Sequence, residues 1–232
     1  MSITAVREVT CRCGAPVRVF VATSVNAERH PHMRDAILRR TFHVFECGAC
    51  RQPLAIDKEL LYIDLGRREF YGVFPLGAAR DPAPCARQIA EAYETALGPG
   101  TGAAGQGLAD GMRVRLCFGL EELREKIVAR AAGLSDLALE LLKADVLAAN
   151  PELAGLSVWT LRLEAVGEDG NLGMRLEQAG EPPRLLADRA LTIDRAAYER
   201  FAALDWQDAI ARLPGIAAGP HVSLLRLALA GA

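Results

Sequence analysis

Two short segments, each carrying a pair of cysteines, constrain this chain more than any other feature. The first is VTCRCGAP, which holds Cys11 and Cys13, and the second is FECGAC, which holds Cys47 and Cys50. Structural zinc prefers four thiolate or imidazole ligands in a tetrahedron, and two ligands in one tight turn can reach the same ion. The four cysteines therefore predict one structural zinc site, which contributes folding energy rather than chemistry because it is closed.

The two turns differ in spacing. In CGAC the cysteines are separated by Gly48 and Ala49, which are small enough to let the chain fold closely around a metal. In CRC the gap is one residue, so Thr10 falls where the first cysteine of a common Cys-x-x-Cys-Gly turn would stand. Either Cys11 ligates from an altered turn, or three thiolates are joined by a different fourth ligand. The local candidates for that ligand are His30, His32 and His43.

The spacing of Cys47 and Cys50 also allows a thiol oxidoreductase. A thioredoxin-type site places its cysteine pair before a helix that lowers the pKa of one thiol. Here the pair is followed by RQPLAI, in which Pro53 and the β-forming residues favour another strand. The oxidoreductase is therefore the alternative to the zinc site, and reduced cysteines without metal are the third possibility.

Composition restricts the class of protein. The chain has 232 residues, a formal net charge of -2 and an ordinary globular balance of apolar and charged residues. A chain of this length can bury a core without disulfides, and a dedicated nucleic-acid binder usually carries a basic excess. No stretch approaches the roughly 20 apolar residues of a membrane helix. We expect a cytoplasmic protein with reduced cysteines, in which Cys85 and Cys117 behave as small buried apolar residues.

A glycine-rich segment divides the chain. Residues 98–111, GPGTGAAGQGLADG, are expected to form a linker or a long surface loop. They would separate a zinc-ribbon-like domain at 1–97, with added strands and a helix, from a small α+β domain at 112–232. Gly100, Gly102 and Gly105 match G-x-G-x-x-G, but a dinucleotide site needs a strand before this motif and a helix after it. Here a helix is expected before the motif and a strand after it, so nucleotide binding is not predicted.

Hydrophobic periodicity mixes strands and helices in both parts, which predicts an α+β fold. Strands are expected at 15–25, 41–47, 59–65, 69–76 and 112–118, with a hairpin at 158–178. Helices are expected at 31–40, 82–97, 119–133 and 136–150, with one or two more in 194–215. Ser135 can cap the helix that follows it, and Trp159 and Trp206 are expected to anchor the core of the C-terminal domain.

Two charged stretches have ordinary structural explanations. Glu121, Glu122 and Glu125 place favourable negative charge at a helix start beside Lys126. The arginine-rich stretch from Arg29 to Arg40 is expected to be a solvated helix face. A nucleic-acid-binding module that uses the Arg29–Arg40 stretch is a second alternative function.

Several segments together resemble one bacterial family. They are SITAVREVTCRCG, FECGACRQ, LLYIDLGRREFYGVFP and RVRLCFGLEELREKIVARAAGLSDLALELLK. In this order they are similar to the CpXC-domain proteins, named for two Cys-Pro-x-Cys motifs, over roughly residues 1–145. The chain departs from that pattern because Arg12 precedes Cys13 and Gly48 follows Cys47, so both prolines are missing. The resemblance implies a zinc-ribbon-like module and supplies no reaction.

The expected function is a binding or assembly module with structural zinc held by Cys11, Cys13, Cys47 and Cys50. No acid, base or nucleophile set adjoins these cysteines in the sequence, so we identify no catalytic residue and favour a protein that is not an enzyme. Ribbons commonly present rigid surfaces to a protein partner. A homodimer would cover strand edges left outside the ribbon.

Overall fold

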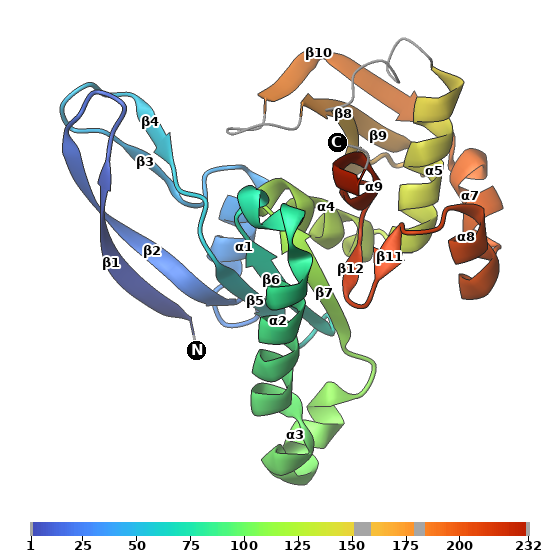
Figure 1. Ribbon diagram of the computed structural model, residues 1–232, viewed down its shortest axis with the longest axis horizontal. Coiled ribbons are helices and arrows are strands. Elements are labelled where there is room, and N and C mark those ends of the chain that lie inside the picture. Colours follow the sequence, from blue (N-terminus) through green and yellow to red (C-terminus); the bar gives the residue numbers. More distant parts are fainter. Residues whose placement is uncertain (1, 151–158, 179–183, 231–232) are drawn as a thin grey trace. The chain divides into compact units, whose positions relative to one another are not determined.

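The computed structural model confirms the α+β class and divides the chain into two compact units (Figure 1). Unit 1 comprises Met1–Leu120 and unit 2 comprises Glu121–Ala232. The structure describes residues 2–150, 159–178 and 184–230. Each unit is described by itself below.

A five-stranded sheet forms the centre of unit 1. Its strands are β1 (Ile3–Thr10), β2 (Pro16–Asn26), β5 (Leu60–Asp64), β6 (Glu69–Phe74) and β7 (Arg113–Phe118), in the order β1-β2-β5-β6-β7. β1 pairs with β2 and β5 pairs with β6 in antiparallel fashion, whereas β2–β5 and β6–β7 are parallel. β6 is buried along its whole length and has a hydrogen-bonded neighbour on each side.

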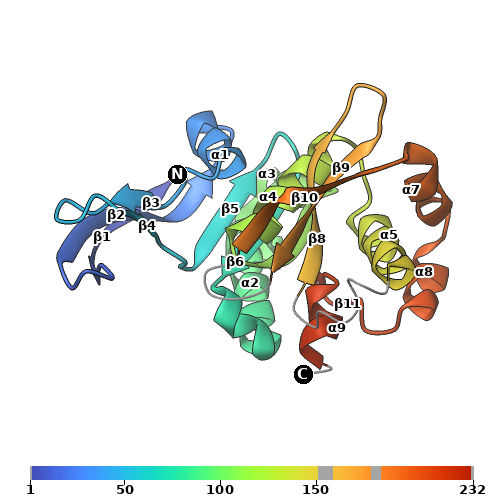
Figure 2. The ribbon, with the colours of Figure 1, turned by 90° about the horizontal axis from the view of Figure 1, so that it is seen from above.

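A second hairpin packs against the part of β1 and β2 that lies nearest the turn between them. Its strands are β3 (Val44–Glu46) and β4 (Pro53–Ala55), which pair with each other in antiparallel fashion. In both views the β3–β4 hairpin runs alongside the β1–β2 hairpin (Figures 1 and 2). The small core between the hairpins consists of Val19, Val21 and Ile56, with Val9, Val17, Phe45 and Leu54 packed around it. We call these two hairpins the ribbon.

Helices complete unit 1. They are α1 (Pro31–Leu38), the 3-10 turn η1 (Leu76–Arg80) and α2 (Pro82–Leu97). Helix α2 begins at Pro82, which is the start predicted from the sequence. Ile89 and Leu97 of α2 pack on Phe70 of β6. Gly72 of β6 permits this close approach, because a Cβ there would lie 2.8 Å from Cδ1 of Ile89.

The segment at 98–111, which the sequence predicts to be a linker or a long surface loop, contains helical structure. It contains the 3-10 turn η2 (Pro99–Thr101) and the helix α3 (Gly102–Ala109). The Arg68 guanidinium donates hydrogen bonds to the carbonyl groups of Gly107, Leu108 and Asp110, which holds the end of α3. β7 follows and joins the sheet of unit 1 beside β6. The units therefore divide after Leu120, whereas the sequence placed the division at 98–111 and assigned residues from 112 onward to the second domain.

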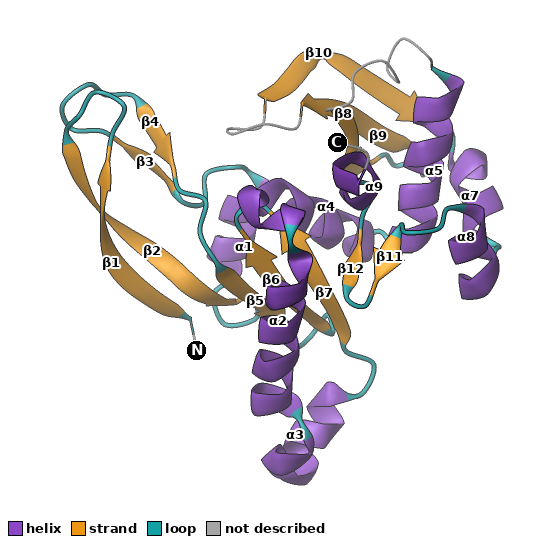
Figure 3. Ribbon diagram, in the orientation of Figure 1, coloured by secondary structure: helices purple, strands orange, loops and turns teal. Residues whose placement is uncertain are grey.

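Unit 2 combines two long helices, a three-stranded sheet and a C-terminal group of short elements (Figure 3). The helices are α4 (Leu120–Ala131) and α5 (Asp136–Ala149), and the sheet has the order β10-β9-β8. Its strands are β8 (Trp159–Val166), β9 (Leu172–Gln178) and β10 (Arg184–Ile193). The remaining elements are α7 (Arg195–Ala202), α8 (Trp206–Arg212), β11 (Ala217–Ala218), β12 (His221–Val222) and α9 (Leu225–Ala230).

The core of unit 2 follows the predicted apolar pattern. Leu137 and Leu141 of α5 pack with Leu161 and Leu163 of β8 and with Met174 of β9. The antiparallel β8–β9 hairpin confirms the prediction for 158–178. Two helices, α7 and α8, lie in the region where the sequence allowed one or two.

In unit 2, the predicted helix cap is confirmed and one predicted core residue is wrong. The Ser135 side chain accepts a hydrogen bond from Ala138 N, which confirms the predicted cap of α5. Trp206 is 53% exposed, so its prediction as a core anchor is wrong. It is the first residue of α8, and it follows the capping residue Asp205. The side chain of Trp159 lies outside the described residues.

Membrane insertion of a helix is not indicated. In the described ranges, the helices are too short or too polar to cross a bilayer.

Candidate metal centre

Cys11 and Cys13 lie in the turn that joins β1 to β2. The strand register ends at the pair Thr10 and Pro16, so residues 11–15 reverse the chain. Cys11 N donates to the carbonyl of Ala15 at 2.9 Å, and Gly14 N donates to the carbonyl of Cys11 at 2.8 Å. Gly14 has a φ of 87°, in the left-handed region that favours glycine. The turn leaves Cys11 buried and Cys13 exposed.

Cys47 and Cys50 lie in the corresponding turn between β3 and β4. Cys47 N donates to the carbonyl of Gln52 at 3.0 Å, and Arg51 N donates to the carbonyl of Cys47 at 2.8 Å. Arg51 has a φ of 60°, so the residue after the second cysteine is left-handed in both turns. The first turn therefore has the design of the second with one residue fewer between its cysteines. Cys47 is buried and Cys50 is partly exposed.

The structure brings the four cysteine sulfurs together. Sγ of Cys11 lies 3.6 Å from Sγ of Cys50, and Sγ of Cys13 lies 3.8 Å from Sγ of Cys47. All four sulfurs lie within 4.8 Å of one another. Four sulfurs placed tetrahedrally at about 2.3 Å from a zinc ion would be about 3.8 Å apart. The donor set therefore fits a metal ion, and Cys11 takes part in it despite the short spacing of its turn.

Two of the histidines proposed as substitute ligands, His43 and His30, make other contacts. His43 accepts a hydrogen bond from Ala22 N at Nε2, 2.9 Å away, and stacks on Phe42. Burial lowers the pKa of His43 to about 4, which keeps the ring neutral. His43 has a φ of 56° and lies in a turn, so the strand expected at 41–47 is shortened to Val44–Glu46. Nδ1 of His30 lies 2.9 Å from Oγ of Ser2. Among the described residues, the metal-competent group at the ribbon contains cysteines alone.

Main-chain groups and neighbouring thiols separate the acidities of the second cysteine pair. Hydrogen bonds from the main chain at Cys50 and Ala49 lower the pKa of Cys47 to about 6. The main chain at Gln52 lowers the pKa of Cys50, but desolvation and the other three thiols outweigh this and raise it to about 12. The Cys47 thiol therefore ionises readily, whereas ionisation of the Cys50 thiol is opposed. A bound cation removes this opposition, because metal-bound thiols are deprotonated.

The arginine-rich stretch around α1 is partly engaged within unit 1. Arg34 Nη1 lies 3.0 Å from Asp64 Oδ2, and Arg39 Nη2 lies 3.8 Å from Asp35 Oδ2. These ion pairs reduce the positive charge that α1 offers to solvent, which weakens the argument for nucleic-acid binding.

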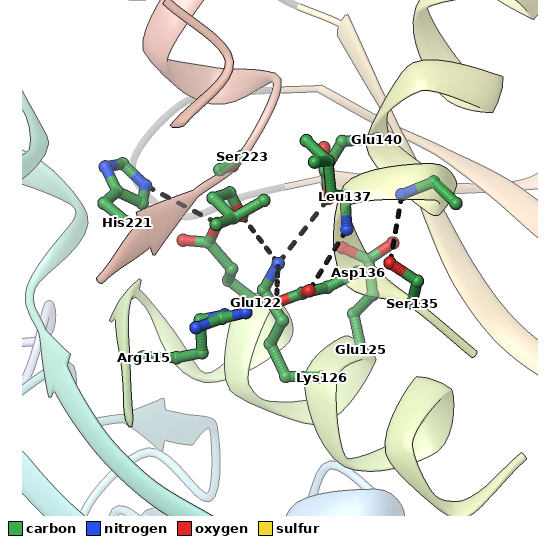
Figure 4. Close-up of polar contacts among 12 residues, drawn as sticks. Arg115, Glu122, Glu125, Lys126, Ser135, Asp136, Leu137, Glu140, His221 and Ser223 are labelled. Carbon is green, nitrogen blue, oxygen red and sulfur yellow. Dashed lines mark hydrogen bonds and ion pairs between the residues drawn. The ribbon is translucent and has the colours of Figure 1, made fainter. Parts of the chain in front are cut away.

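A second group of polar side chains is buried inside unit 2 (Figure 4). Each member is at most 4% exposed. We call this group the ion network; its members are Glu122, Glu125, Lys126, Asp136, Glu140, Lys143, Arg162 and His221. The sequence placed Glu122 and Glu125 at a helix start beside Lys126 but gave no indication that these groups are buried together.

Lys143 and Glu125 form the centre of the ion network. Nζ of Lys143 lies 3.0 Å and 3.1 Å from the two carboxylate oxygens of Glu125 and 2.6 Å from Oε1 of Glu140. Arg162 Nη1 and Leu163 N also donate to Glu125, at 3.0 Å and 2.9 Å. Burial raises the pKa of Glu125, but Lys143, Arg162 and Lys126 outweigh it and hold the pKa below its ordinary value. The carboxylate is therefore ionised.

The ion network also holds the C-terminal part of unit 2. Nζ of Lys126 donates to the carbonyl of Val222 at 2.6 Å, and Oε2 of Glu140 accepts from Leu224 N at 2.7 Å. His221 Nε2 lies 3.7 Å from Glu122 Oε1, a contact drawn in Figure 4. Burial opposes ionisation of Glu122, but His221, Arg162 and Lys126 together lower its pKa. These contacts join α4 and α5 to residues about 80 to 100 positions later.

Comparison with known proteins identifies the family. The family model described as CpXC protein matches residues 9–143, more than half of the chain. The match includes all four clustered cysteines and continues through α4 into α5. No curated protein and no solved structure gives a significant match. The chain belongs to the CpXC protein family.

Proposed function

We propose that the ribbon is a structural-zinc module that presents a rigid surface to a protein partner. The observation that carries the metal-binding part is the convergence of four cysteine sulfurs within 4.8 Å at two facing turns. Four thiolates suit zinc better than the hard cations, which prefer oxygen ligands. Cys11, Cys13, Cys47 and Cys50 would hold the ion and would leave no open position for a substrate.

The size of the ribbon explains why it needs a metal. Its core contains three buried apolar side chains, and β3 and β4 have three residues each. An isolated two-stranded hairpin is marginally stable in water. A zinc ion that joins the two turns therefore supplies cohesion that the core lacks, as in other small metal-dependent domains.

The outer face of the β1–β2 hairpin supports the partner-binding part. Val6 and Phe20 are directly opposite each other in the strand register, and they are 40% and 67% exposed. β1 is also an edge strand of the sheet. An exposed aromatic side chain beside an open strand edge favours contact with another protein surface. A second copy of this chain is one such partner.

A thiol oxidoreductase is the second candidate function. It is favoured by the pKa of about 6 for Cys47, which is in the range of reactive cysteines. Against it, the Cys47–Cys50 pair is flanked by two strands rather than followed by a helix. An oxidoreductase would cycle between a Cys47–Cys50 disulfide and the dithiol, and it would reduce a disulfide substrate with multiple turnovers.

Native mass spectrometry of protein purified in reductant without chelator tests the metal-binding part. We expect one zinc per chain in the wild type, and loss of zinc in Cys11→Ser and Cys47→Ser. Cys85→Ser is the control, because Cys85 is buried in α2 and does not belong to the cysteine cluster. Metal-free wild type that turns over a disulfide substrate would instead establish the oxidoreductase.

The partner surface is tested separately with Phe20→Ser. Leu108→Ser is the matched control, because Leu108 is a 40% exposed apolar residue on α3 of the same unit. Sedimentation measures self-association, and affinity capture measures other partners. We expect Phe20→Ser to lose the interaction that the wild type and Leu108→Ser retain. Equal behaviour of the three proteins contradicts a role for this surface.

A further inference from the structure

The cysteine cluster pairs each accessible residue with a buried one across the two hairpins. Cys13 is exposed and its sulfur lies 3.8 Å from that of Cys47, which is 0% exposed. Cys50 is partly exposed and its sulfur lies 3.6 Å from that of Cys11, which is 6% exposed. Both contacts join the first turn to the second. A disulfide has an S–S distance of about 2.05 Å, so each pair needs to close by less than 2 Å.

We infer that Cys13 and Cys50 are sites of reversible oxidation by a peroxide, each resolved by the buried cysteine of the opposite hairpin. The products are the disulfides Cys13–Cys47 and Cys11–Cys50, with release of the metal. This inference rests on the proposed zinc module and adds a redox response to it. Oxidant reaches the thiolate that is exposed, while the buried partner is already placed to resolve the product.

The chemistry of each pair balances with one peroxide molecule. The Cys13 thiolate attacks one peroxide oxygen, so that an S–O bond forms, the O–O bond breaks and hydroxide leaves. The Cys47 thiolate then attacks the Cys13 sulfur, so that an S–S bond forms, the S–O bond breaks and a second hydroxide leaves. Each sulfur loses one electron and the peroxide gains two. Cys50 and Cys11 react in the same way with a second peroxide molecule.

The proposed pairing has a structural consequence that pairing within the turns lacks. Disulfides within the turns would join Cys11 to Cys13 and Cys47 to Cys50, and they would leave the two hairpins unconnected. Disulfides between the turns replace the connection that the metal provides. The oxidised ribbon therefore keeps its fold, and a thiol reductant with zinc restores the starting state.

Peptide mapping after peroxide treatment of the zinc-loaded wild-type chain tests the inference. Trypsin cleaves after Arg12, which separates Cys11 in residues 8–12 from Cys13 in residues 13–18, whereas residues 41–51 contain both Cys47 and Cys50. Disulfides between the hairpins join all three peptides into one species. Disulfides within the turns leave residues 41–51 as a separate peptide. Fragmentation between Cys47 and Cys50 then assigns each bond.

We expect zinc to be released as the two disulfides form. The intact mass of the oxidised chain should then be four hydrogen atoms below that of the reduced, metal-free chain. Reduction should restore zinc binding. Peptides containing the buried Cys85 and Cys117 serve as internal controls and should stay unmodified. In Cys47→Ser, the sulfenic acid on Cys13 should persist long enough to be trapped with dimedone. Cys11→Ser is the matched control, because it also removes a buried ligand but leaves the Cys13–Cys47 pair intact.

Three results would overturn the inference: zinc retained under peroxide, disulfides in either of the other two pairings, or irreversible sulfinic acid at Cys13 without a disulfide. Each concerns protein that contained zinc before oxidation. Failure of the proposed zinc module is recognised differently, since the reduced protein would then contain no zinc at all.

Discussion

Replacement of Lys143 by methionine should strongly destabilise unit 2. The ammonium group is 0% exposed and lies within 3.1 Å of three carboxylate oxygens, two on Glu125 and one on Glu140. Methionine fills much of the same space but provides no charge. Glu125 keeps its hydrogen bonds from Arg162 and Leu163 N, whereas Glu140 loses the cation 2.6 Å away and retains Lys126 at 3.8 Å.

The expected cost follows from the charge that remains on Glu140. Removal of one partner of a buried ion pair typically costs about 3 to 5 kcal/mol. Each kcal/mol shifts the melting temperature of a domain of about this size by roughly 4 °C or more. We therefore expect the melting temperature of unit 2 to fall by about 10 °C or more in Lys143→Met, measured by calorimetry on the full chain.

Two further proteins decide the interpretation. Lys58→Met makes the same substitution at an exposed lysine and should change stability by no more than about 0.5 kcal/mol. Glu140→Gln combined with Lys143→Met removes both charges while the amide oxygen can still accept from Leu224 N. The double variant should be more stable than the sum of the single effects predicts. A neutral or stabilising Lys143→Met would refute the reasoning that the buried charges depend on one another.

Three other expectations test the turns, the sheet and His43. Burial lowers the pKa of His43 from 6.5 to about 4, so the fold favours the neutral ring. The stability that this ring contributes is complete above pH 6.5 and is lost as the pH falls toward 4. Urea midpoints at pH 7 and 4.5 should therefore differ more in the wild type than in His43→Gln. Gly72→Ala should cost about 1 to 3 kcal/mol because its Cβ meets Ile89, whereas Gly100→Ala, with open space around it, should cost little by the same assay. Gly14→Ala should weaken zinc binding in competition with a chelator because φ is 87°, whereas Gly48→Ala, with neither positive φ nor a close neighbour, should not; equal affinities would contradict the assigned role of Gly14.

The convergence of the cysteines could be predicted from the sequence except for the place of Cys11 in it. A gap of one residue departs from the common turn, and spacing alone does not show whether the shorter turn can still direct its first sulfur inward. The hydrogen bonds from Cys11 N to Ala15 and from Gly14 N to Cys11 answer this, because they repeat those of the second turn. Imidazole ligands are consequently unnecessary.

The ion network and the division between the units could not be predicted in the same way. Burial of Glu125 depends on Arg162 and Lys143, and that of Glu122 depends on His221, which lies 99 positions away (221 − 122). Local periodicity cannot reveal partners at such separations. The glycine-rich segment is predicted from its composition to be a linker or a surface loop, and the contacts that Arg68 makes with its end depend on a residue about 40 positions earlier. The regular elements themselves, such as α2, α5 and the β8–β9 hairpin, follow from local signals.

Zinc X-ray absorption of the reduced, chelator-free protein tests the central claim most directly. The arrangement of Cys11, Cys13, Cys47 and Cys50 within 4.8 Å predicts one zinc per chain with four sulfur neighbours at about 2.3 Å. In Cys11→Ser the zinc should be lost. A wild-type protein that contains no metal, or whose zinc has nitrogen or oxygen among its ligands, would contradict a four-cysteine zinc centre.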